Sequence, residues 1–283
     1  MIKLVNARKK YGKFELNASM EIPSGRITGL VGKNGAGKST VIKLILGLIN
    51  ADSGEVETLC KPANALSPQD KMNLGVTLAE AGFCPQFTIN EVELILRNMY
   101  PEFDKEFFKS KCHQLGLPKE KRIREFSTGM KAKLRVLIAV SHKAKLLILD
   151  EPTSGLDVEA RNEVLDMLRE YMALDEERSI LITSHISTDL ENLCDDIYMI
   201  HNGEMVLHEE TDAILEQYGI VKVNENEYEK LEKEYILKSQ KTKYGYACFV
   251  KDKKFYQENY PELVIENGGI DELILMMTGG YKS

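Results

Sequence analysis

The stretch that decides the fold is Gly32-Lys33-Asn34-Gly35-Ala36-Gly37-Lys38-Ser39. It matches the pattern G-x-x-x-x-G-K-[ST] at every fixed position. It lies between an apolar run at 27–31 and a run with helical spacing that begins at Val41. Glycines allow backbone N–H groups to turn around phosphate oxygens at the start of a helix. A glycine-rich turn can match this pattern by chance, but the flanking strand and helix favour a phosphate-binding loop.

The polar residues of this loop have expected roles. In loops of this pattern the Lys38 ammonium reaches the β- and γ-phosphates of a nucleoside triphosphate, and the Ser39 hydroxyl coordinates Mg²⁺. The residues predicted to bind the nucleotide are Gly32, Lys33, Asn34, Gly35, Ala36, Gly37, Lys38, Ser39 and Thr40.

Two carboxylates follow a second buried strand. The apolar run 146–149 ends in Asp150 and Glu151, which places both at the carboxyl edge of the expected sheet, where open α/β sheets bind ligands. Asp150 suits the Mg²⁺ shell, and Glu151 can polarise the attacking water as a general base. A strand that runs into an acidic turn is common, so the phosphate loop is what favours the functional interpretation.

A histidine follows a third apolar run. His185 comes directly after Ser184 and the strand expected at 180–183. A histidine at this position can hydrogen-bond a γ-phosphate or the attacking water. A lone histidine is more often structural, but its place at the same sheet edge favours a role in catalysis.

Composition narrows the class of protein. The chain has 283 residues and a formal net charge of −7, which disfavours nucleic-acid binding by bulk electrostatics. No apolar run reaches the ~18 residues that a membrane-spanning helix needs. The N-terminus lacks a secretion signal, and the five cysteines form no CxxC pair. We therefore expect a cytoplasmic protein with reduced thiols.

The order of the elements predicts an α/β fold. Strands alternate with helices over 1–210, which indicates a mostly parallel sheet covered on both faces. Helices are expected at 91–100, 104–115, 131–140 and 158–174. Eight of the twelve tyrosines lie after residue 210, and a strand at 244–250 and a helix at 270–277 are expected there. We therefore predict a small α+β accessory unit over 211–283.

Several motifs together resemble the ATP-binding subunits of ABC transporters. Phe126-Ser127-Thr128-Gly129-Met130 stands where that family has its signature motif, and Ser127 lies 23 positions before Asp150. Ser154-Gly155-Leu156-Asp157 is similar to the family's D-loop, and His185 matches its switch histidine. Tyr11, 27 positions before Lys38, is similar to the aromatic residue that stacks on adenine. The resemblance covers residues 1 to about 210.

The resemblance implies a fold and a mechanism. It implies a P-loop NTPase of the ABC ATPase type, with an antiparallel β subdomain, a helical subdomain at about 86–144 and the C-terminal α+β extension. ATP and Mg²⁺ are the implied cofactors, and two ATPase subunits pair head to tail as a homodimer or heterodimer. Each ATP then lies between the phosphate loop of one subunit and the signature residues Ser127, Thr128, Gly129 and Met130 of the other, with Asp157 in the D-loop.

The sequence also departs from the family pattern. Thr128 and Met130 replace the usual glycine and glutamine of the signature. Where the family has its Q-loop glutamine, this chain has Ala79-Glu80, so Glu80 is assigned the role linked to the metal or water, with Gln86 as the alternative. Both departures resemble the ABC-2-type branch, which includes antibiotic exporters.

The expected function is therefore ATP hydrolysis that powers transport. The implied partner is a membrane-spanning permease subunit, which would hold the chain at the inner face of the cell membrane. A soluble ABC ATPase that acts on the ribosome or nucleic acid is the alternative. A single phosphate loop and the lack of sustained heptads disfavour it, and no nucleic-acid partner is expected. A non-hydrolysing nucleotide switch is disfavoured by Glu151 and His185.

Overall fold

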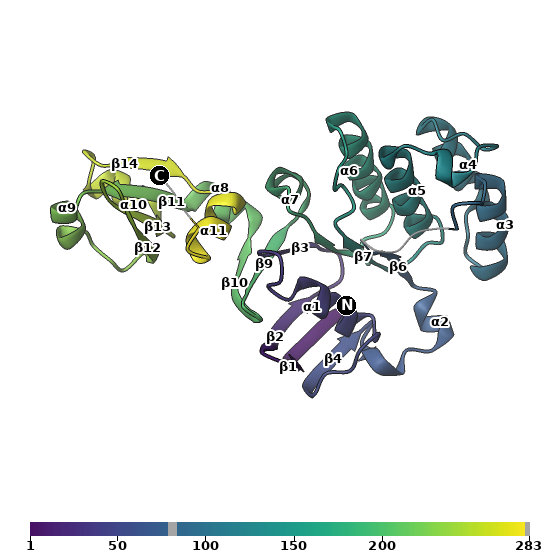
Figure 1. The fold of residues 1–283 in the computed structure, drawn as a ribbon, viewed down its shortest axis with the longest axis horizontal. Helices are drawn as coiled ribbons and strands as arrows, with labels where there is room; N and C mark the ends of the chain where they lie inside the picture. Colours follow the sequence, from purple (N-terminus) through teal and green to yellow (C-terminus); the bar gives the residue numbers. More distant parts are fainter. Residues whose placement is uncertain (79–83, 281–283) are drawn as a thin grey trace.

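The computed structural model describes residues 1–78 and 84–280, and these residues form two β-sheets with helices packed on them (Figure 1). The larger sheet has ten strands in the order β5-β4-β1-β2-β10-β9-β3-β8-β7-β6. The smaller sheet has four strands in the order β12-β13-β11-β14. No helix among the described residues combines the length and the apolar character needed to cross a bilayer.

The parallel half of the large sheet carries the functional edge. Its strands, in spatial order, are β9 (Asp196–His201), β3 (Ile27–Val31), β8 (Ser179–Thr183), β7 (Leu146–Asp150) and β6 (Leu74–Thr77). Strands β3 and β8 are buried along their whole length, as expected of parallel strands covered on both faces. The runs at 27–31, 146–149 and 180–183 are therefore confirmed as buried strands.

The other half of the sheet is mainly antiparallel. Its strands are β1 (Ile2–Tyr11), β2 (Phe14–Ile22), β4 (Ser53–Thr58), β5 (Lys61–Pro62) and β10 (Glu204–Glu210). Only the contact of β10 with β2 is parallel here, at a single residue pair. Tight hairpins at Gly12 and Gly203, both with positive φ, reverse the chain between neighbouring strands. This half is the antiparallel β subdomain that the family resemblance implies, and the mostly parallel pattern expected from the order of the elements holds for the other half of the sheet.

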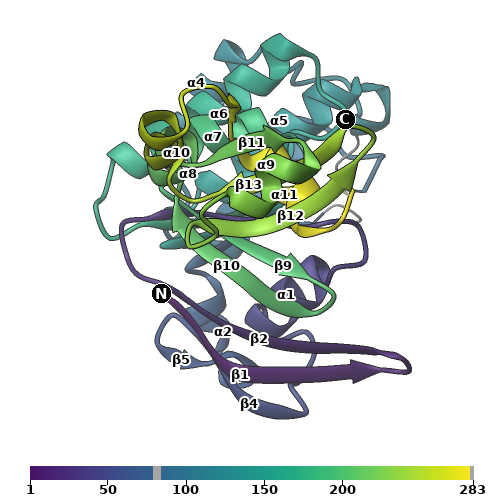
Figure 2. The same cartoon turned by 90° about the vertical axis from the view of Figure 1, so that its left-hand side faces the viewer.

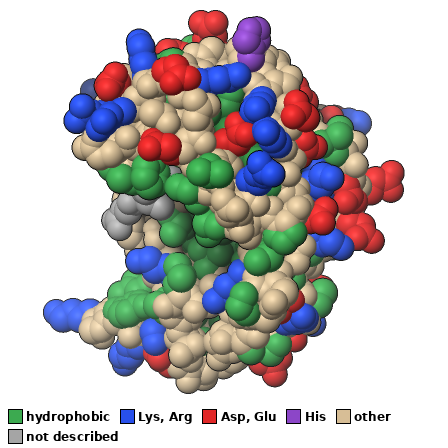
Figure 3. Space-filling view, turned by 90° about the vertical axis from the view of Figure 1, so that its right-hand side faces the viewer, with side chains coloured by type: hydrophobic (Ala, Val, Ile, Leu, Met, Phe, Trp, Pro, Cys, Tyr) green, Lys and Arg blue, Asp and Glu red, His purple; other side chains and the backbone are tan. Residues whose placement is uncertain are grey.

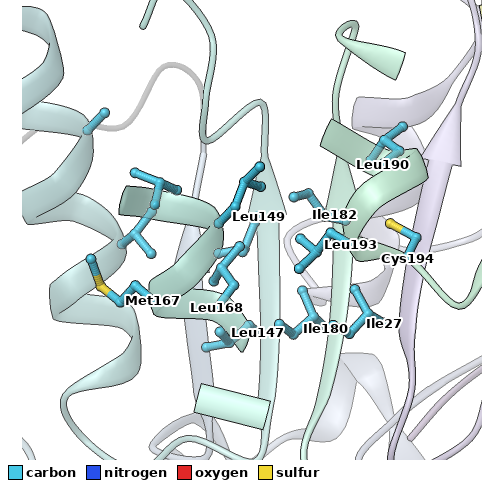
Figure 4. Packing of buried hydrophobic residues seen from close by; sticks show 14 of the residues in the cluster. Ile27, Leu147, Leu149, Met167, Leu168, Ile180, Ile182, Leu190, Leu193 and Cys194 are labelled. Carbon is cyan, nitrogen blue, oxygen red and sulfur yellow. The ribbon is translucent and has the colours of Figure 1, made fainter. Parts of the chain in front are cut away.

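Alternating side chains of the central strands divide the core into two layers. Leu147, Leu149, Ile180 and Ile182 face the helices α6 (Val158–Ala173) and α7 (Ser187–Leu193), and Figure 4 shows this packing with Met167 and Leu168. Leu146, Ile148 and Leu181 face the opposite side of the sheet and belong to the same hydrophobic cluster as the buried side chains of α1 (Lys38–Ile45). Each of these side chains contributes about 1.5–3 kcal/mol by burial.

Three helices form a compact group beside strand β6 (Figure 1). They are α3 (Ile89–Met99), α4 (Lys105–Gln114) and α5 (Thr128–Val140), and each begins after a side chain that caps it, namely Thr88, Asp104 and Ser127. Helix α3 begins before Glu91 because Glu91 closes a capping box with Thr88. The short elements are η1 (Ala63–Ala65), α2 (Pro68–Lys71) and η2 (Ile123–Glu125).

The C-terminal residues form the smaller sheet and its helices (Figure 2). The elements are α8 (Thr211–Gln217), β11 (Gly219–Val223), α9 (Glu225–Lys230), β12 (Ile236–Thr242), β13 (Gly245–Val250), α10 (Lys253–Asn259), β14 (Val264–Asn267) and α11 (Ile270–Met277). The strand expected at 244–250 and the helix expected at 270–277 are confirmed. One hydrophobic core joins this part to the large sheet, so the division at residue 210 stays a prediction.

The hairpin turn at Gly203 ties the sheet to the phosphate loop. Its N–H donates to the Ala36 carbonyl at 2.9 Å, and its φ is +84°. A Cβ at Gly203 would lie 2.0 Å from the Glu15 carbonyl oxygen, whereas a Cβ at Gly12, also at positive φ, would meet no atom within 4 Å. A side chain at Gly12 would therefore meet only backbone strain, whereas a side chain at Gly203 would meet the same strain and a steric clash.

Gly203→Ala should lower the free energy of unfolding by about 3 kcal/mol, because left-handed strain and overpacking add. Gly12→Ala should lower it by only about 1 kcal/mol, because strain alone acts there. Urea unfolding of both variants, followed by circular dichroism, measures the difference. Equal losses for the two variants would contradict the packing described for this turn.

Candidate functional site

The phosphate loop connects β3 to α1 and is shaped by three glycines with positive φ. Gly32, Gly35 and Gly37 have φ values of 153°, 81° and 122°. A Cβ at Gly32 would lie 2.3 Å from the Ile200 carbonyl oxygen, so only glycine allows this approach of loop and strand β9. No side chain caps α1, which leaves the N–H groups of its first turn available to an anion.

The loop borders a cavity of about 330 Å³ at the carboxyl edge of the parallel strands. The residues that line it are Phe14, Lys33, Asn34, Gly35, Gly37, Lys38, Ser39, Thr40, Asp150 and Glu151. Seven of the nine predicted loop residues line this cavity together with both predicted carboxylates. Gly32 and Ala36 belong to the same loop but are absent from that lining, and Ala36 is buried.

Lys38 places a half-buried ammonium at this cavity. Its Nζ donates to the Gly32 carbonyl at 2.6 Å, which holds the ammonium over the loop. Burial lowers the pKa of Lys38, and the nearby carboxylates of Glu151 and Asp150 partly oppose that shift. A phosphate group would supply the negative charge that a half-buried ammonium lacks.

The Thr183 hydroxyl orients both carboxylate residues. Asp150 pairs with Thr183 across the parallel strands β7 and β8. Thr183 Oγ1 donates to Asp150 Oδ1 at 2.7 Å and accepts from the Glu151 backbone N–H at 3.1 Å. Sequence reasoning missed Thr183, although a threonine at the end of the neighbouring parallel strand was the available signal. Its side chain is fully buried, which fixes its position.

Glu151 and His185 form a close pair at the same edge. His185 Nδ1 lies 2.5 Å from Glu151 Oε2, and the His185 backbone N–H donates to the same oxygen at 3.1 Å. Glu151 has a φ of +51°, a conformation that costs a non-glycine residue of order 1 kcal/mol or more. The pairing supports the predicted roles, because it places a carboxylate and an imidazole beside the cavity that holds Lys38.

The signature residues lie at the start of α5, away from this cavity. Ser127 accepts from the Met130 N–H at 3.1 Å as the N-cap. Thr128 and Gly129 lie near the turn into α6, where a Cβ at Gly129 would be 3.4 Å from the Ala160 Cβ. Asp157 caps α6 through the Ala160 N–H at 2.9 Å. Within the described chain, none of these residues lines the cavity.

Two aromatic side chains stand at the tip of the β1–β2 hairpin. Tyr11 and Phe14 are paired in register, but only Phe14 lines the cavity. Tyr11 is 47% exposed, and Lys9 Nζ lies 5.7 Å from its ring centroid. The sequence patterns gave no role to Phe14, because its place at the cavity depends on how the hairpin folds over the phosphate loop.

Two residues are candidates for the role of the Q-loop glutamine, Glu80 and its alternative Gln86. Glu80 lies outside the described residues. Gln86, the alternative, is described, and its Oε1 accepts from Arg122 Nη1 at 2.6 Å near the start of η2. The role of Glu80 therefore stays a prediction.

The donor set fits a hard divalent cation. Ser39 and Asp150 both line the cavity, and oxygen ligands of this kind suit Mg²⁺. The Thr183 hydrogen bond leaves the second Asp150 oxygen, Oδ2, without a partner in the described chain. Asp150 and Ser39 are therefore the residues that would hold the ion. When bound, it would neutralise charge on the phosphate oxygens.

The fold and the residues gathered at this edge define a P-loop nucleoside triphosphatase. A phosphate loop, the Asp150 carboxylate that is predicted to bind the metal, and a carboxylate–imidazole pair meet at one end of a parallel sheet.

Comparison with known proteins defines the family. The model of the ABC transporter family matches residues 16–154. The chain is 32% identical over 217 residues to the lantibiotic transport ATP-binding protein SrtF of Streptococcus pyogenes, which covers 75% of this chain and 92% of the relative. It is 33% identical to the ABC transporter ATP-binding protein YtrB of Bacillus subtilis, covering 71% and 68% of the two chains. The linearmycin resistance ATP-binding protein LnrL of the same organism is 34% identical, covering 73% and 68%.

The chain therefore belongs to the ABC transporter family and is an ABC ATPase, as its motifs predicted. Solved structures support the fold. An ATP-binding subunit of an ABC transporter superimposes with a TM-score of 0.67 at 24% identity, covering 75% of this chain and 91% of that chain. A dimeric ATP-binding cassette with bound ADP and Pi superimposes with a TM-score of 0.64 at 21% identity, covering 75% and 99%.

The two hairpin aromatics make a prediction about adenine stacking. We expect Phe14→Leu to weaken ATP binding about five- to tenfold, because stacking on a base is worth ~1–3 kcal/mol. Tyr11→Leu should weaken it by less, since Tyr11 does not line the cavity. Titration with a fluorescent ATP analogue measures both affinities. If Tyr11→Leu weakens ATP binding more than Phe14→Leu does, Tyr11 is the residue that stacks on adenine, as the family resemblance implies.

Proposed function

We propose that this chain is the ATP-hydrolysing subunit of an exporter, and that it powers transport through a separate membrane-spanning partner by ATP-driven closure and opening of a dimer. The observation that carries the proposal is the Glu151–His185 pair at the cavity of Lys38. A site that only binds nucleotide needs no carboxylate held for water activation. The relatives named for lantibiotic transport and linearmycin resistance support export.

The cavity is proposed to be half of the catalytic site. The signature residues lie at the start of α5 rather than around the loop of their own chain. A second subunit that approaches head to tail would bring its Ser127 and Gly129 onto the triphosphate. The Ser127 hydroxyl and the N–H groups of the first turn of α5 would then donate to the γ-phosphate.

The residues of the site divide the chemistry among themselves. Lys38 and the loop N–H groups would hold the β- and γ-phosphates, and Ser39 and Asp150 would hold Mg²⁺. Glu151 would accept a proton from the water that attacks the γ-phosphorus, while ADP leaves. His185 would keep the Glu151 carboxylate in place through its ring and backbone nitrogens. Loss of the bridging phosphate would then loosen the pair of subunits.

The membrane partner is proposed to dock at the helical group. Helix α3 buries Val92 and Leu96 but leaves Leu94, Ile95 and Met99 37–59% exposed. Figure 3 shows hydrophobic side chains gathered in a hollow on this side of the molecule. An amphipathic helix of a permease fits an apolar hollow of this kind. The chain would then be cytoplasmic and peripheral at the inner face of the cell membrane.

The proposed base makes the first prediction for this function. Glu151→Gln should lower ATP turnover ~100-fold or more, because general-base catalysis is lost while the side chain keeps its size. ATP binding should remain, and an ATP-bound dimer should accumulate. Single-turnover kinetics and light scattering with ATP and Mg²⁺ measure these effects.

Lys38→Ala is the control that removes binding. It should abolish nucleotide affinity and give a monomer under the same conditions, because the charge opposite the phosphates is gone. If Glu151→Gln retains turnover within twofold of wild type, Glu151 is not the base and the proposed hydrolytic site is wrong.

Changes on α3 test the membrane partner. Leu94→Asp with Met99→Asp should abolish co-purification of a polytopic membrane protein from detergent-solubilised membranes, because two charges would enter an apolar contact. ATP affinity should stay unchanged. Asn98→Asp, which adds a single charge at an exposed position of the same helix, is the control. If the double variant and the Asn98→Asp control recover the membrane protein equally well, α3 is not part of the interface.

A further inference from the structure

The last helix of the chain lies between the C-terminal unit and the ATPase site. Figure 1 shows α11 on the side of that unit that faces the large sheet. It is eight residues long, about 12 Å. It contacts α7, the helix that begins two residues after His185. The established activity and the proposed export function assign it no role.

The N-terminal end of α11 is bonded to α7 in two ways. The Ser187 Oγ donates to Asp271 Oδ1, and Glu191 Oε1 accepts from the Ile270 backbone N–H at 3.0 Å. Ser187 is 6% exposed, and a hydrogen bond to a carboxylate in such surroundings is among the stronger kinds. Because Ser187 is the first residue of α7, this bond acts on the loop that carries His185.

The C-terminal end of α11 is bonded to the phosphate loop. Lys33 Nζ donates to the Thr278 carbonyl at 3.4 Å, and Gly280 follows beside the same ammonium. The carbonyls at a helix C-terminus carry partial negative charge, so they attract a cation. Lys33 lines the cavity next to Lys38. One end of the helix thus contacts α7 directly after the loop that carries His185, and the other end contacts the phosphate loop.

The body of α11 is fixed by packing. Ile270, Leu273 and Met276 recur at a spacing of three residues and are fully buried. They share one core with Leu190 and Leu193 of α7. A closely packed helix transmits a displacement instead of absorbing it. The contacts at its two ends are therefore mechanically connected.

We propose that α11 is a positioning element of the ATPase site, which holds the His185 loop through Asp271 and the phosphate loop through Lys33. The proposal rests on the placement of the triphosphate in the proposed site. Asp271 contacts no residue of the cavity lining. Its loss therefore disturbs the alignment of His185 with Glu151 and leaves the grip on the phosphates intact. The C-terminal unit then positions residues of the ATPase site without lining its cavity.

Asp271→Ala tests the proposal in the full chain. The kcat for ATP should fall about five- to tenfold, because a small misplacement of a catalytic group costs the chemical step. The KM for ATP should change less than twofold. Asp271→Asn keeps an oxygen acceptor for Ser187 and should restore at least half of the wild-type kcat. Glu272→Ala is the control, since the described chain gives Glu272 no hydrogen-bond partner.

The outcomes separate this inference from the proposed site. A kcat of Asp271→Ala equal to that of Glu272→Ala, or a rise in KM alone, would overturn the positioning role. Failure of Asp271→Asn to restore turnover would do the same. If Asp271→Ala does not fold, Ser187→Ala is measured by the same criteria. Wild-type turnover in Glu151→Gln would instead show that the proposed site itself is wrong.

A second variant tests the connection between the two ends. Lys33→Met removes the bond to Thr278 and also a side chain of the cavity lining, so it should raise the KM for ATP, and its effect on kcat at saturating ATP should overlap with that of Asp271→Ala because that effect acts through one helix. The double variant should therefore lose no more than about twofold beyond the stronger single variant. If the loss of kcat in the double variant equals the product of the two single losses, the two ends of α11 act independently and the proposed connection is wrong.

Discussion

Parallel pairing of β7 with β8 is the constraint on which the site depends. It sets Asp150 opposite Thr183, so that one buried hydroxyl bonds the proposed metal ligand and the backbone of the proposed base. Glu151, one residue after Asp150, and His185, two residues after Thr183, then lie 2.5 Å apart at their Oε2 and Nδ1 atoms. A shift of one residue in this register would turn the Asp150 side chain to the other face of the sheet. The chemistry of the edge is therefore set by the strand pairing.

The same sheet joins the remaining parts. Strand β9 approaches Gly32 so closely that only glycine fits, and the β9–β10 turn donates to Ala36. These contacts hold the loop against the large sheet. The C-terminal end of α11 contacts the same loop, because Lys33 donates to the Thr278 carbonyl. The signature residues lie at the start of α5 and do not line the cavity of the loop. The architecture therefore combines a tightly packed phosphate loop with separate signature residues, which we propose donate to the nucleotide of a second subunit.

Local patterns predicted much of this arrangement. The phosphate loop is defined by glycine and lysine spacing within one short segment, and the carboxylates follow an apolar strand whose burial is readable from its composition. The roles of Thr183 and Phe14 depend on neighbours in space, which the spacing of residues along the chain does not reveal. The contacts of α11 join positions 84 and 245 residues apart. The antiparallel β subdomain followed from the family resemblance, whereas the place of β10 between β2 and β9 depends on residues far apart along the chain.

The central claim is that the triphosphate is enclosed between the phosphate loop of one copy and Ser127 of another. A structure of the full chain with a non-hydrolysable ATP analogue and Mg²⁺ tests it most directly. The account predicts a head-to-tail pair in which Ser127 of each copy lies within about 3 Å of a γ-phosphate held by Lys38 of the other. A closed pair with Ser127 directed away from the nucleotide, or nucleotide bound outside the Lys38 cavity, would contradict it.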